Sequence, residues 1–351
     1  MFHDNDPTRP VTQALLRPNR SHDYDDGLAD LLDVIGTNYR YNELIAAHRA
    51  RPTRKIVGTE NRHDLASWLA ARDTPAYAGE FIWSGIDYLG EAWFWPNVAS
   101  SSGLLDRTAR PRPDAYQVQS WWSAAPMVFA ARRVAPTPRG PADPGYGPVQ
   151  HRRMQVLFPD WNPRDASPHD ETVEVYSNCA QVELLLNGKT LGTQNLAADL
   201  APRTWHVPYA PGTLRAVGRN RGKVVATAEL GTAGKPVRIQ LTAERSRVSP
   251  DWDDVDYINA AIVDANGVVV PEAVNLVAFN VSGPGEIVAV DSANNASHEP
   301  FQARERHAFQ GRCLAIIRAT APSGTITITA TAPDLAAASV NVQALAVTSG
   351  P

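Results

Sequence analysis

The sequence has few cysteines, no long apolar run and no excess of positive charge, and each absence narrows the class of protein. Its two cysteines, Cys179 and Cys313, lie far apart in the chain, so we expect two buried free thiols and no disulfide framework. No apolar stretch approaches the roughly 20 residues that span a bilayer. The formal net charge of -4 offers no basic surface, so neither nucleic acid nor a membrane is expected as a partner.

Metal-site spacing and a targeting signal are missing as well. No His, Cys and Asp residues cluster at the spacing of a metal site, and we expect neither a metal nor a cofactor. Residues 1–10 have neither the basic n-region nor the apolar h-region of a signal peptide. The compartment therefore stays open, and the periplasm and the extracellular space are both compatible with the sequence.

The first 130 residues contain short apolar runs that alternate with helical patterns. Three runs end in polar or aromatic residues, at 32–39, 56–60 and 79–83. Acidic residues from 23 to 30 are expected to begin a helix that turns Leu28, Leu31 and Leu32 inward. Further helices are expected at 41–51, 63–72 and 114–122. Strands and helices that alternate at this spacing predict βαβ units and a parallel sheet.

Two of these runs end in a carboxylate and a tryptophan. The loops at the C-terminal ends of barrel strands build the active site, so residues placed there are candidates for chemistry. Glu60 and Trp83 suit a sugar, because the carboxylate can react while the indole packs on the apolar face of a pyranose. We interpret Glu60 as the catalytic nucleophile of a glycosidase and Trp83 as the floor of the sugar subsite. A buried structural carboxylate and a core tryptophan are the alternatives.

Four more residues are predicted to bind the substrate. Asn38 and Tyr39 end the preceding strand, where they would orient the nucleophile or touch the sugar, although core packing explains them equally well. Asp87 and Glu91 follow Trp83 and would bind sugar hydroxyls, although salt bridges within a loop are the commoner use of such residues.

The second part of the chain changes from a helical period to a period of two. Residues 136–149 are rich in proline and glycine, which predicts a linker. Short alternating strands follow, with a hairpin turn at 187–188, and predict an immunoglobulin-like β-sandwich over 150–236. The same pattern predicts a second sandwich over 237–351.

These motifs together resemble the C-terminal half of glycoside hydrolase family 2 enzymes of the β-galactosidase type. Segments 6–12, 33–39, 56–60 and 81–91 look like the family's barrel strands six to eight, and 176–188 resembles the sandwich after the barrel. The 237–347 region is similar to the terminal sandwich. The resemblance covers nearly the whole chain. It implies a partial (β/α)8 TIM barrel over 1–135, followed by two immunoglobulin-like domains.

The resemblance also implies a retaining mechanism with two carboxylates, a nucleophile and an acid/base. The family's nucleophile ends strand seven, which matches Glu60. Its acid/base follows an asparagine at the end of strand four, and that strand has no counterpart here. The dipeptide at 42–43 mimics the motif, but by position Glu43 begins a helix and is expected to be a surface residue. Resemblance to related barrels further suggests a cis peptide bond between Trp83 and Ser84.

From this resemblance we expect a fragment of a glycosidase that hydrolyses O-glycosyl bonds of a β-galactoside-like carbohydrate. A barrel typically needs about 250 residues, and only about 130 are present, which indicates a fragment. Because the acid/base has no counterpart here, we expect the isolated chain to be inactive. A second chain could supply the missing N-terminal half, as one part of a split enzyme. The alternative from another class is a non-catalytic carbohydrate-binding or adhesion module. The sequence leaves the sugar, the linkage and the oligomeric state open.

Overall fold

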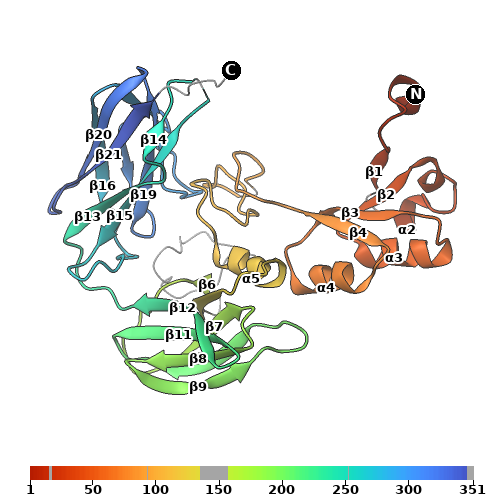
Figure 1. The fold of residues 1–351 in the computed structure, drawn as a ribbon, viewed down its shortest axis with the longest axis horizontal. Coiled ribbons are helices and arrows are strands. Elements are labelled where there is room, and N and C mark those ends of the chain that lie inside the picture. Colours follow the sequence, from red (N-terminus) through yellow and green to blue (C-terminus); the bar gives the residue numbers. More distant parts are fainter. Residues whose placement is uncertain (16–17, 93, 135–156, 252, 346–351) are drawn as a thin grey trace. The chain divides into compact units, whose positions relative to one another are not determined.

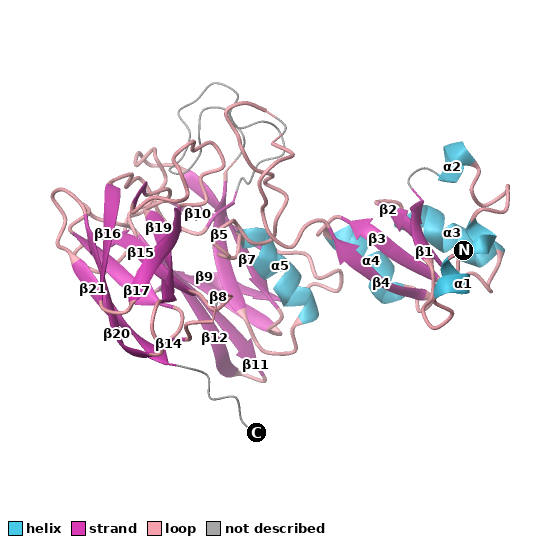
Figure 2. Cartoon of the chain, turned by 90° about the horizontal axis from the view of Figure 1, so that it is seen from above, coloured by secondary structure: helices cyan, strands magenta, loops and turns pink. Residues whose placement is uncertain are grey.

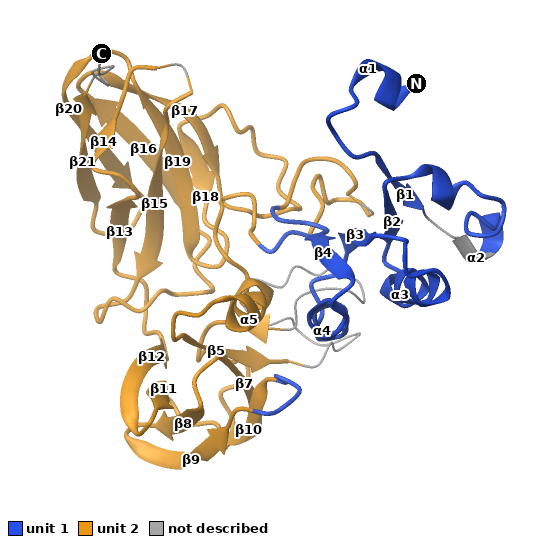
Figure 3. Cartoon of the chain, turned by 45° about the vertical axis from the view of Figure 1, so that its right-hand side comes forward, with its two compact units in different colours: residues 1–86, 102–104, 197–201 blue, residues 87–101, 105–196, 202–351 orange. Residues whose placement is uncertain are grey.

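The computed structural model describes residues 1–15, 18–92, 94–134, 157–251 and 253–345. The chain divides into two compact units, which Figure 3 colours blue and orange. Unit 1 comprises residues 1–86, 102–104 and 197–201, and unit 2 comprises 87–101, 105–196 and 202–351. Unit 1 contains a parallel sheet with helices and unit 2 contains antiparallel sheets, so an α/β part precedes an all-β part.

Unit 1 is built on a four-stranded parallel sheet whose spatial order β1-β2-β3-β4 follows the chain. The strands are β1 (Thr12–Leu15), β2 (Val34–Asn38), β3 (Ile56–Asn61) and β4 (Tyr77–Ile82). The helices are α1 (Phe2–Asn5), α2 (Pro18–Ser21), α3 (Tyr41–Ala50) and α4 (Leu65–Asp73), with a 3-10 turn η1 (Ala29–Leu31). The alternation of strands and helices expected from the sequence is therefore confirmed.

Helices α3 and α4 lie side by side on one face of this sheet, as Figures 1 and 2 show. Leu44 of α3 packs in one hydrophobic cluster with the strand residues Ile35 and Ile56, and all three are buried. Helix α4 begins where expected because the Asp64 side chain accepts a hydrogen bond of 2.8 Å from the backbone N–H of Ser67. Such a cap satisfies a donor that the first helical turn leaves unpaired.

The prediction that a helix begins within the acidic residues 23–30 is wrong. Only the three-residue turn η1 forms there, and Leu31 is 78% exposed instead of buried. Gly27 lies in the left-handed region at φ 93°, and the Asp26 side chain accepts a hydrogen bond of 3.0 Å from the N–H of Leu28. An Asx-type turn of this kind competes with helix formation, so the acidic residues cap a turn here.

The first sandwich in unit 2 consists of two four-stranded antiparallel sheets. One has the order β10-β7-β5-β6 and the other β12-β11-β8-β9, and both contribute to one apolar core around Trp161. A helix, α5 (Pro113–Trp122), packs against β5 and β7. The strands are β5 (Val128–Arg133), β6 (Leu157–Phe158), β7 (Asp170–Ser177), β8 (Gln181–Leu186), β9 (Lys189–Asn195), β10 (Arg203–Pro208), β11 (Thr213–Asn220) and β12 (Lys223–Gly231).

The sheets of the first sandwich include residues from before the expected linker. Strand β5 pairs with β7, with Val128 opposite Ser177, so this sheet begins upstream of residue 136. The predicted linker at 136–149 and the predicted start of the sandwich at 150 lie outside the described residues, as does Trp93. The hairpin turn joining β8 and β9 is confirmed, with Asn187 and Gly188 both at positive φ.

A buried arginine lies between two carboxylates in the first sandwich. Arg132 of β5 is fully buried, with its guanidinium 2.9 Å from Asp160 and 3.3 Å from Glu171. On the surface of the same sandwich, Arg215 and Glu229 form a cross-strand pair of 3.2 Å whose side chains are 50% and 56% exposed. The two arginines thus provide a buried and an exposed ion pair in one domain.

The terminal sandwich has a four-stranded sheet, β13-β15-β19-β17, facing a five-stranded one, β14-β21-β20-β16-β18. The pairing is antiparallel except between β14 and β21. Both cysteines are buried free thiols, one in each sandwich, as expected. The strands are β13 (Arg238–Ala243), β14 (Arg247–Val248), β15 (Asp256–Val263), β16 (Leu276–Ser282), β17 (Gly285–Asp291), β18 (Glu305–His307), β19 (Arg312–Ala319), β20 (Ser323–Thr331) and β21 (Ala338–Leu345).

One carboxylate organises the turn where the terminal sandwich begins. Asp264 accepts backbone hydrogen bonds from Gly234, Asn266 and Val268 at 2.8, 2.9 and 2.8 Å. These bonds, led by the one from Gly234, lower the pKa of the Asp264 carboxyl. The ionised side chain therefore holds the segment between β12 and β13 against the turn after β15.

Candidate functional site

Glu60 is the penultimate residue of β3 and lies at the edge of the sheet where all four parallel strands end. The register of β2 and β3 places Asn38 directly beside Glu60. The Asn38 amide Nδ2 donates a hydrogen bond of 3.1 Å to Oε2 of Glu60, and the Tyr39 hydroxyl donates one to Oε1. The structure therefore brings together three of the predicted site residues through the two oxygens of one carboxylate.

The donors to Glu60 are themselves held in place. Thr59 Oγ1 donates a hydrogen bond of 3.0 Å to Oδ1 of Asn38, which fixes the amide with its NH2 group toward the carboxylate. Tyr39 has a positive φ of 59°, and its backbone N–H donates a hydrogen bond of 2.6 Å to the Glu60 carbonyl. A carboxylate that is held from two sides keeps one orientation, as a nucleophile or a binding group requires.

Trp83 follows β4, the next strand of the sheet. Its backbone N–H donates a hydrogen bond of 2.8 Å to the carbonyl of Asn61, the residue after Glu60. The side chain is 39% exposed. The Trp83–Ser84 peptide bond is cis, as the sequence resemblance suggested. Ser84 is buried and hydrogen-bonded to Ser102, through its N–H at 3.1 Å and through the two hydroxyls at 3.0 Å.

The remaining two predicted residues lie in unit 2. Asp87 is buried and forms an ion pair with Arg112, and it also accepts a hydrogen bond of 3.1 Å from Asn295. Glu91 is exposed and accepts a hydrogen bond from the Tyr88 hydroxyl. The structure therefore shows internal partners for both carboxylates, and their binding of a sugar stays a prediction.

A carboxyl group that the sequence reasoning missed lies on β4. Burial, with a contribution from nearby Asp64, raises the pKa of Glu80 to about 7. Its Oε2 has no hydrogen-bond partner among the described residues. The signal in the sequence was a charged residue inside an otherwise apolar run. A carboxyl group buried in such a run is partly protonated near neutral pH.

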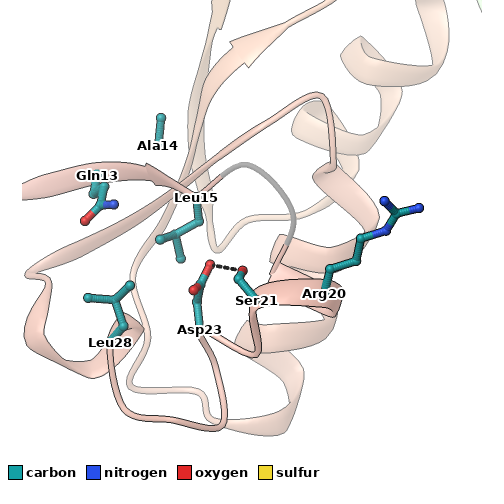
Figure 4. Close-up of a pocket in the computed structure, with 7 residues that line it drawn as sticks. All are labelled: Gln13, Ala14, Leu15, Arg20, Ser21, Asp23 and Leu28. Carbon is teal, nitrogen blue, oxygen red and sulfur yellow. Dashed lines mark hydrogen bonds between the residues drawn. The ribbon is translucent and has the colours of Figure 1, made fainter.

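An open pocket lies at the end of β1 (Figure 4). Its volume is about 520 Å³, and Ser21 Oγ donates a hydrogen bond of 2.6 Å to Asp23 inside it. The pocket contains none of the predicted site residues. Its lining consists of Gln13, Ala14, Leu15, Arg20, Ser21, Asp23 and Leu28.

The described residues contain no group of three or more His, Cys, Asp or Glu side chains that could hold a metal ion. Among them, no helix is both long enough and apolar enough to cross a bilayer.

Comparison with known families and structures agrees with this architecture. Residues 239–341 match the glycoside hydrolase family 2 C-terminal domain 5, and residues 170–226 match a domain of unknown function, DUF4982. A solved glycosyl hydrolase family 2 member from Bacteroides cellulosilyticus is 33% identical, with a TM-score of 0.85 over 97% of this chain and 45% of that chain. The chain thus corresponds to the C-terminal region of glycoside hydrolase family 2 proteins.

The relatives are named for different activities. The beta-galactosidase BoGH2A of Bacteroides ovatus is 29% identical over 97% of this chain and 42% of its own length. A solved beta-glycosidase from Bacteroides vulgatus is 25% identical, with a TM-score of 0.80, covering 97% of this chain and 48% of that chain. A beta-glucuronidase of Formosa agariphila is 26% identical over 71% of this chain and 22% of its own. The chain therefore spans less than half the length of each.

Proposed function

We propose that this chain forms part of a retaining β-glycosidase, with Glu60 as the catalytic nucleophile and a β-galactoside-like carbohydrate as the substrate. The observation that carries the proposal is the pair of hydrogen bonds from Asn38 and Tyr39, one to each oxygen of Glu60, at the sheet edge where strands end. The family 2 relationship supplies the reaction class.

The arrangement of unit 1 supports an arc of a (β/α)8 barrel. The four strands are parallel and follow one another in order, and α3 and α4 cover one face, whereas a doubly wound sheet places helices on both faces. The four strands are half the number that such a barrel contains. In the same way, the two sandwiches of unit 2 are proposed to be immunoglobulin-like.

In the proposed mechanism a Glu60 carboxylate oxygen attacks the anomeric carbon while the bond from that carbon to the leaving-group oxygen breaks. An acid on a strand outside these residues protonates the leaving group, about 5.5 Å from the nucleophile in retaining enzymes. Water then attacks the glycosyl-enzyme ester, the acid now acting as base, and the carboxylate is released. Asn38 and Tyr39 hold Glu60 for both steps, and Trp83, Asp87 and Glu91 are assigned to the sugar.

The site is tested by hydrolysis of an aryl β-galactoside with a good leaving group, which lessens the need for an acid. The chain is assayed alone and mixed with the N-terminal half of a family 2 relative. An aryl β-glucuronide is run in parallel, because one of the relatives carries that name. We expect activity in the mixture, loss of that activity in Glu60→Gln, and no more than background from the chain alone.

Glu43→Gln is the matched control, because Glu43 pairs with Arg40 at 2.6 Å on the first turn of α3. We expect it to keep its activity. A well-assembled complex without activity would refute the catalytic proposal and favour the carbohydrate-binding or adhesion module instead. Sugar binding that survives removal of residues 1–135 would favour that module too.

A further inference from the structure

The segment from Asp87 to Arg112, which follows Trp83 in the chain, is bonded to a loop of the terminal sandwich. Except for residues 102–104, the segment belongs to unit 2, as its partner does, and Figure 3 colours both orange. The described residues of the segment, all but 93, form no strand or helix, only isolated bridges such as the one between Leu89 and Ala99. Its partner is the loop from Ser292 to Arg304, between β17 and β18, which we call the 292–304 loop.

Asn295, in the 292–304 loop, makes four of the bonds between the two segments. Its amide Nδ2 donates to Asp87 at 3.1 Å and to the Ser100 carbonyl at 3.2 Å, and its Oδ1 accepts from Arg107. Its backbone carbonyl accepts a hydrogen bond of 2.7 Å from the N–H of Val98. One side chain thus joins both ends of the segment to the terminal sandwich.

A second connection is ionic. Arg107 forms a bidentate pair with Asp291, the last residue of β17, at 3.0 Å from each carboxylate oxygen. Arg107 is 6% exposed and Asp291 10%, so this pair is desolvated. Arg306, fully buried, lies 3.3 Å from the same carboxylate. Removing one charged group of this cluster should destabilise the fold, because it weakens the pairing of the buried charges that remain.

Asp87, one of the two carboxylates assigned to the sugar under the proposed function, is bonded to this cluster. Its carboxylate receives Arg112 from one side and Asn295 from the other, and its side chain is fully buried. The orientation of Asp87 therefore depends on a residue 208 positions away in the chain. The segment between these contacts also carries Glu91, the other carboxylate assigned to the sugar.

We propose that Asn295 and Asp291 are positioning residues, through which the terminal sandwich orders the segment 87–112 and sets the placement of Asp87 and Glu91. The role in substrate binding rests on the proposed function. The ordering of the segment does not, so the two parts can be tested apart.

The ordering is tested by hydrogen exchange of the full chain. The N–H groups of Gly90 and Ser100 are reporters, because they bond to Val98 and Tyr88 within the segment. In Asn295→Ala we expect them to exchange at least about tenfold faster, because bonds to two charged groups are lost. Asn341→Ala is the matched control, since this asparagine of β21 accepts a hydrogen bond from Thr327 within the same sandwich and should leave the reporters unchanged.

Substitutions of the ionic connection provide a rescue. Arg107→Ala should speed exchange of the same reporters, and Arg107→Lys should recover part of their protection because it keeps a cation beside Asp291. Unchanged exchange in both Asn295→Ala and Arg107→Ala, in protein whose sandwich strands stay protected, would overturn the proposal.

The binding role is tested in the assembled enzyme by separating KM from kcat. We expect Asn295→Ala to raise KM about tenfold and to change kcat by less than about twofold, because the carboxylates it positions hold the sugar equally in ground and transition states. Faster exchange with an unchanged KM would overturn the binding role and leave a structural brace. If the wild-type assembly is inactive, the proposed function fails, and the exchange experiment alone decides the ordering.

Discussion

Replacing the residues that hold Glu60 should lower activity in a graded way that follows the hydrogen bonds. Asn38→Ala removes the 3.1 Å bond to the Glu60 carboxylate. A hydrogen bond to a charged group contributes about 1.5–3 kcal/mol. If all of it is used in the transition state, kcat falls by about 10- to 150-fold, at about 1.4 kcal/mol for each factor of ten.

Thr59→Val acts one step further away. It removes the 3.0 Å bond that orients Asn38 and leaves the bond to Glu60 possible. A bond between neutral groups contributes about 0.5–1.5 kcal/mol, so kcat should fall by only about 2- to 12-fold. The order of severity is therefore Glu60→Gln, then Asn38→Ala, then Thr59→Val.

The assay is hydrolysis of the aryl glycoside by the assembled enzyme at saturating substrate, with hydrogen exchange of β2 and β3 as the measure of folding. The reasoning would be refuted if Asn38→Ala kept full kcat while the strands stayed protected. It would also be refuted if Thr59→Val were the more harmful of the two.

Three further predictions concern stability and are read by hydrogen exchange of the strands around each residue. Arg132→Met should destabilise the first sandwich by about 3–5 kcal/mol, because it removes the buried guanidinium that pairs with both Asp160 and Glu171. Arg215→Met on the surface should cost at most about 1 kcal/mol, and equal effects of the two substitutions would contradict this. The pKa of Glu80 is raised from 4.5 to about 7, so ionisation of its carboxyl group destabilises the folded state as the pH rises through that range. Glu80→Gln should therefore stabilise unit 1 above pH 7 but not below pH 4.5. A difference in stability that did not depend on pH would contradict this. Because the pKa of Asp264 lies below its ordinary value of 3.8, the ionised side chain stabilises the terminal sandwich at pH values above 3.8. Asp264→Asn should therefore be destabilising at pH 7 and progressively less so as the pH falls below 3.8. A loss of stability that grew as the pH fell would contradict this.

Local patterns were enough to predict the strands and to place Asn38 and Glu60 at the ends of neighbouring strands. Each residue ends an apolar run, and the ends of adjacent parallel strands meet at one edge of the sheet. The hydrogen bond between them follows from this shared position. The helices α3 and α4 were predictable for the same reason, because their periodicity and their boundaries are encoded within about ten residues.

Features that depend on distant partners could not be predicted. Asp87 meets Arg112 and Asn295, which are 25 and 208 positions away, and no local pattern encodes such pairs. The raised pKa of Glu80 depends on how deeply β4 is covered, which its sequence does not state. The failed helix before β2 shows the opposite limit: the apolar spacing was present, but a positive φ at Gly27 decided the local structure.

The central claim, that Glu60 is the nucleophile, is tested most directly by trapping the covalent intermediate. The assembled enzyme is incubated with a 2-deoxy-2-fluoro-β-galactoside that carries a good leaving group, and this chain is then analysed by intact mass and peptide mapping. The account predicts one added fluorosugar, attached to Glu60 in a peptide from β3, and none in Glu60→Gln. An active enzyme that carried the label on another residue would contradict it.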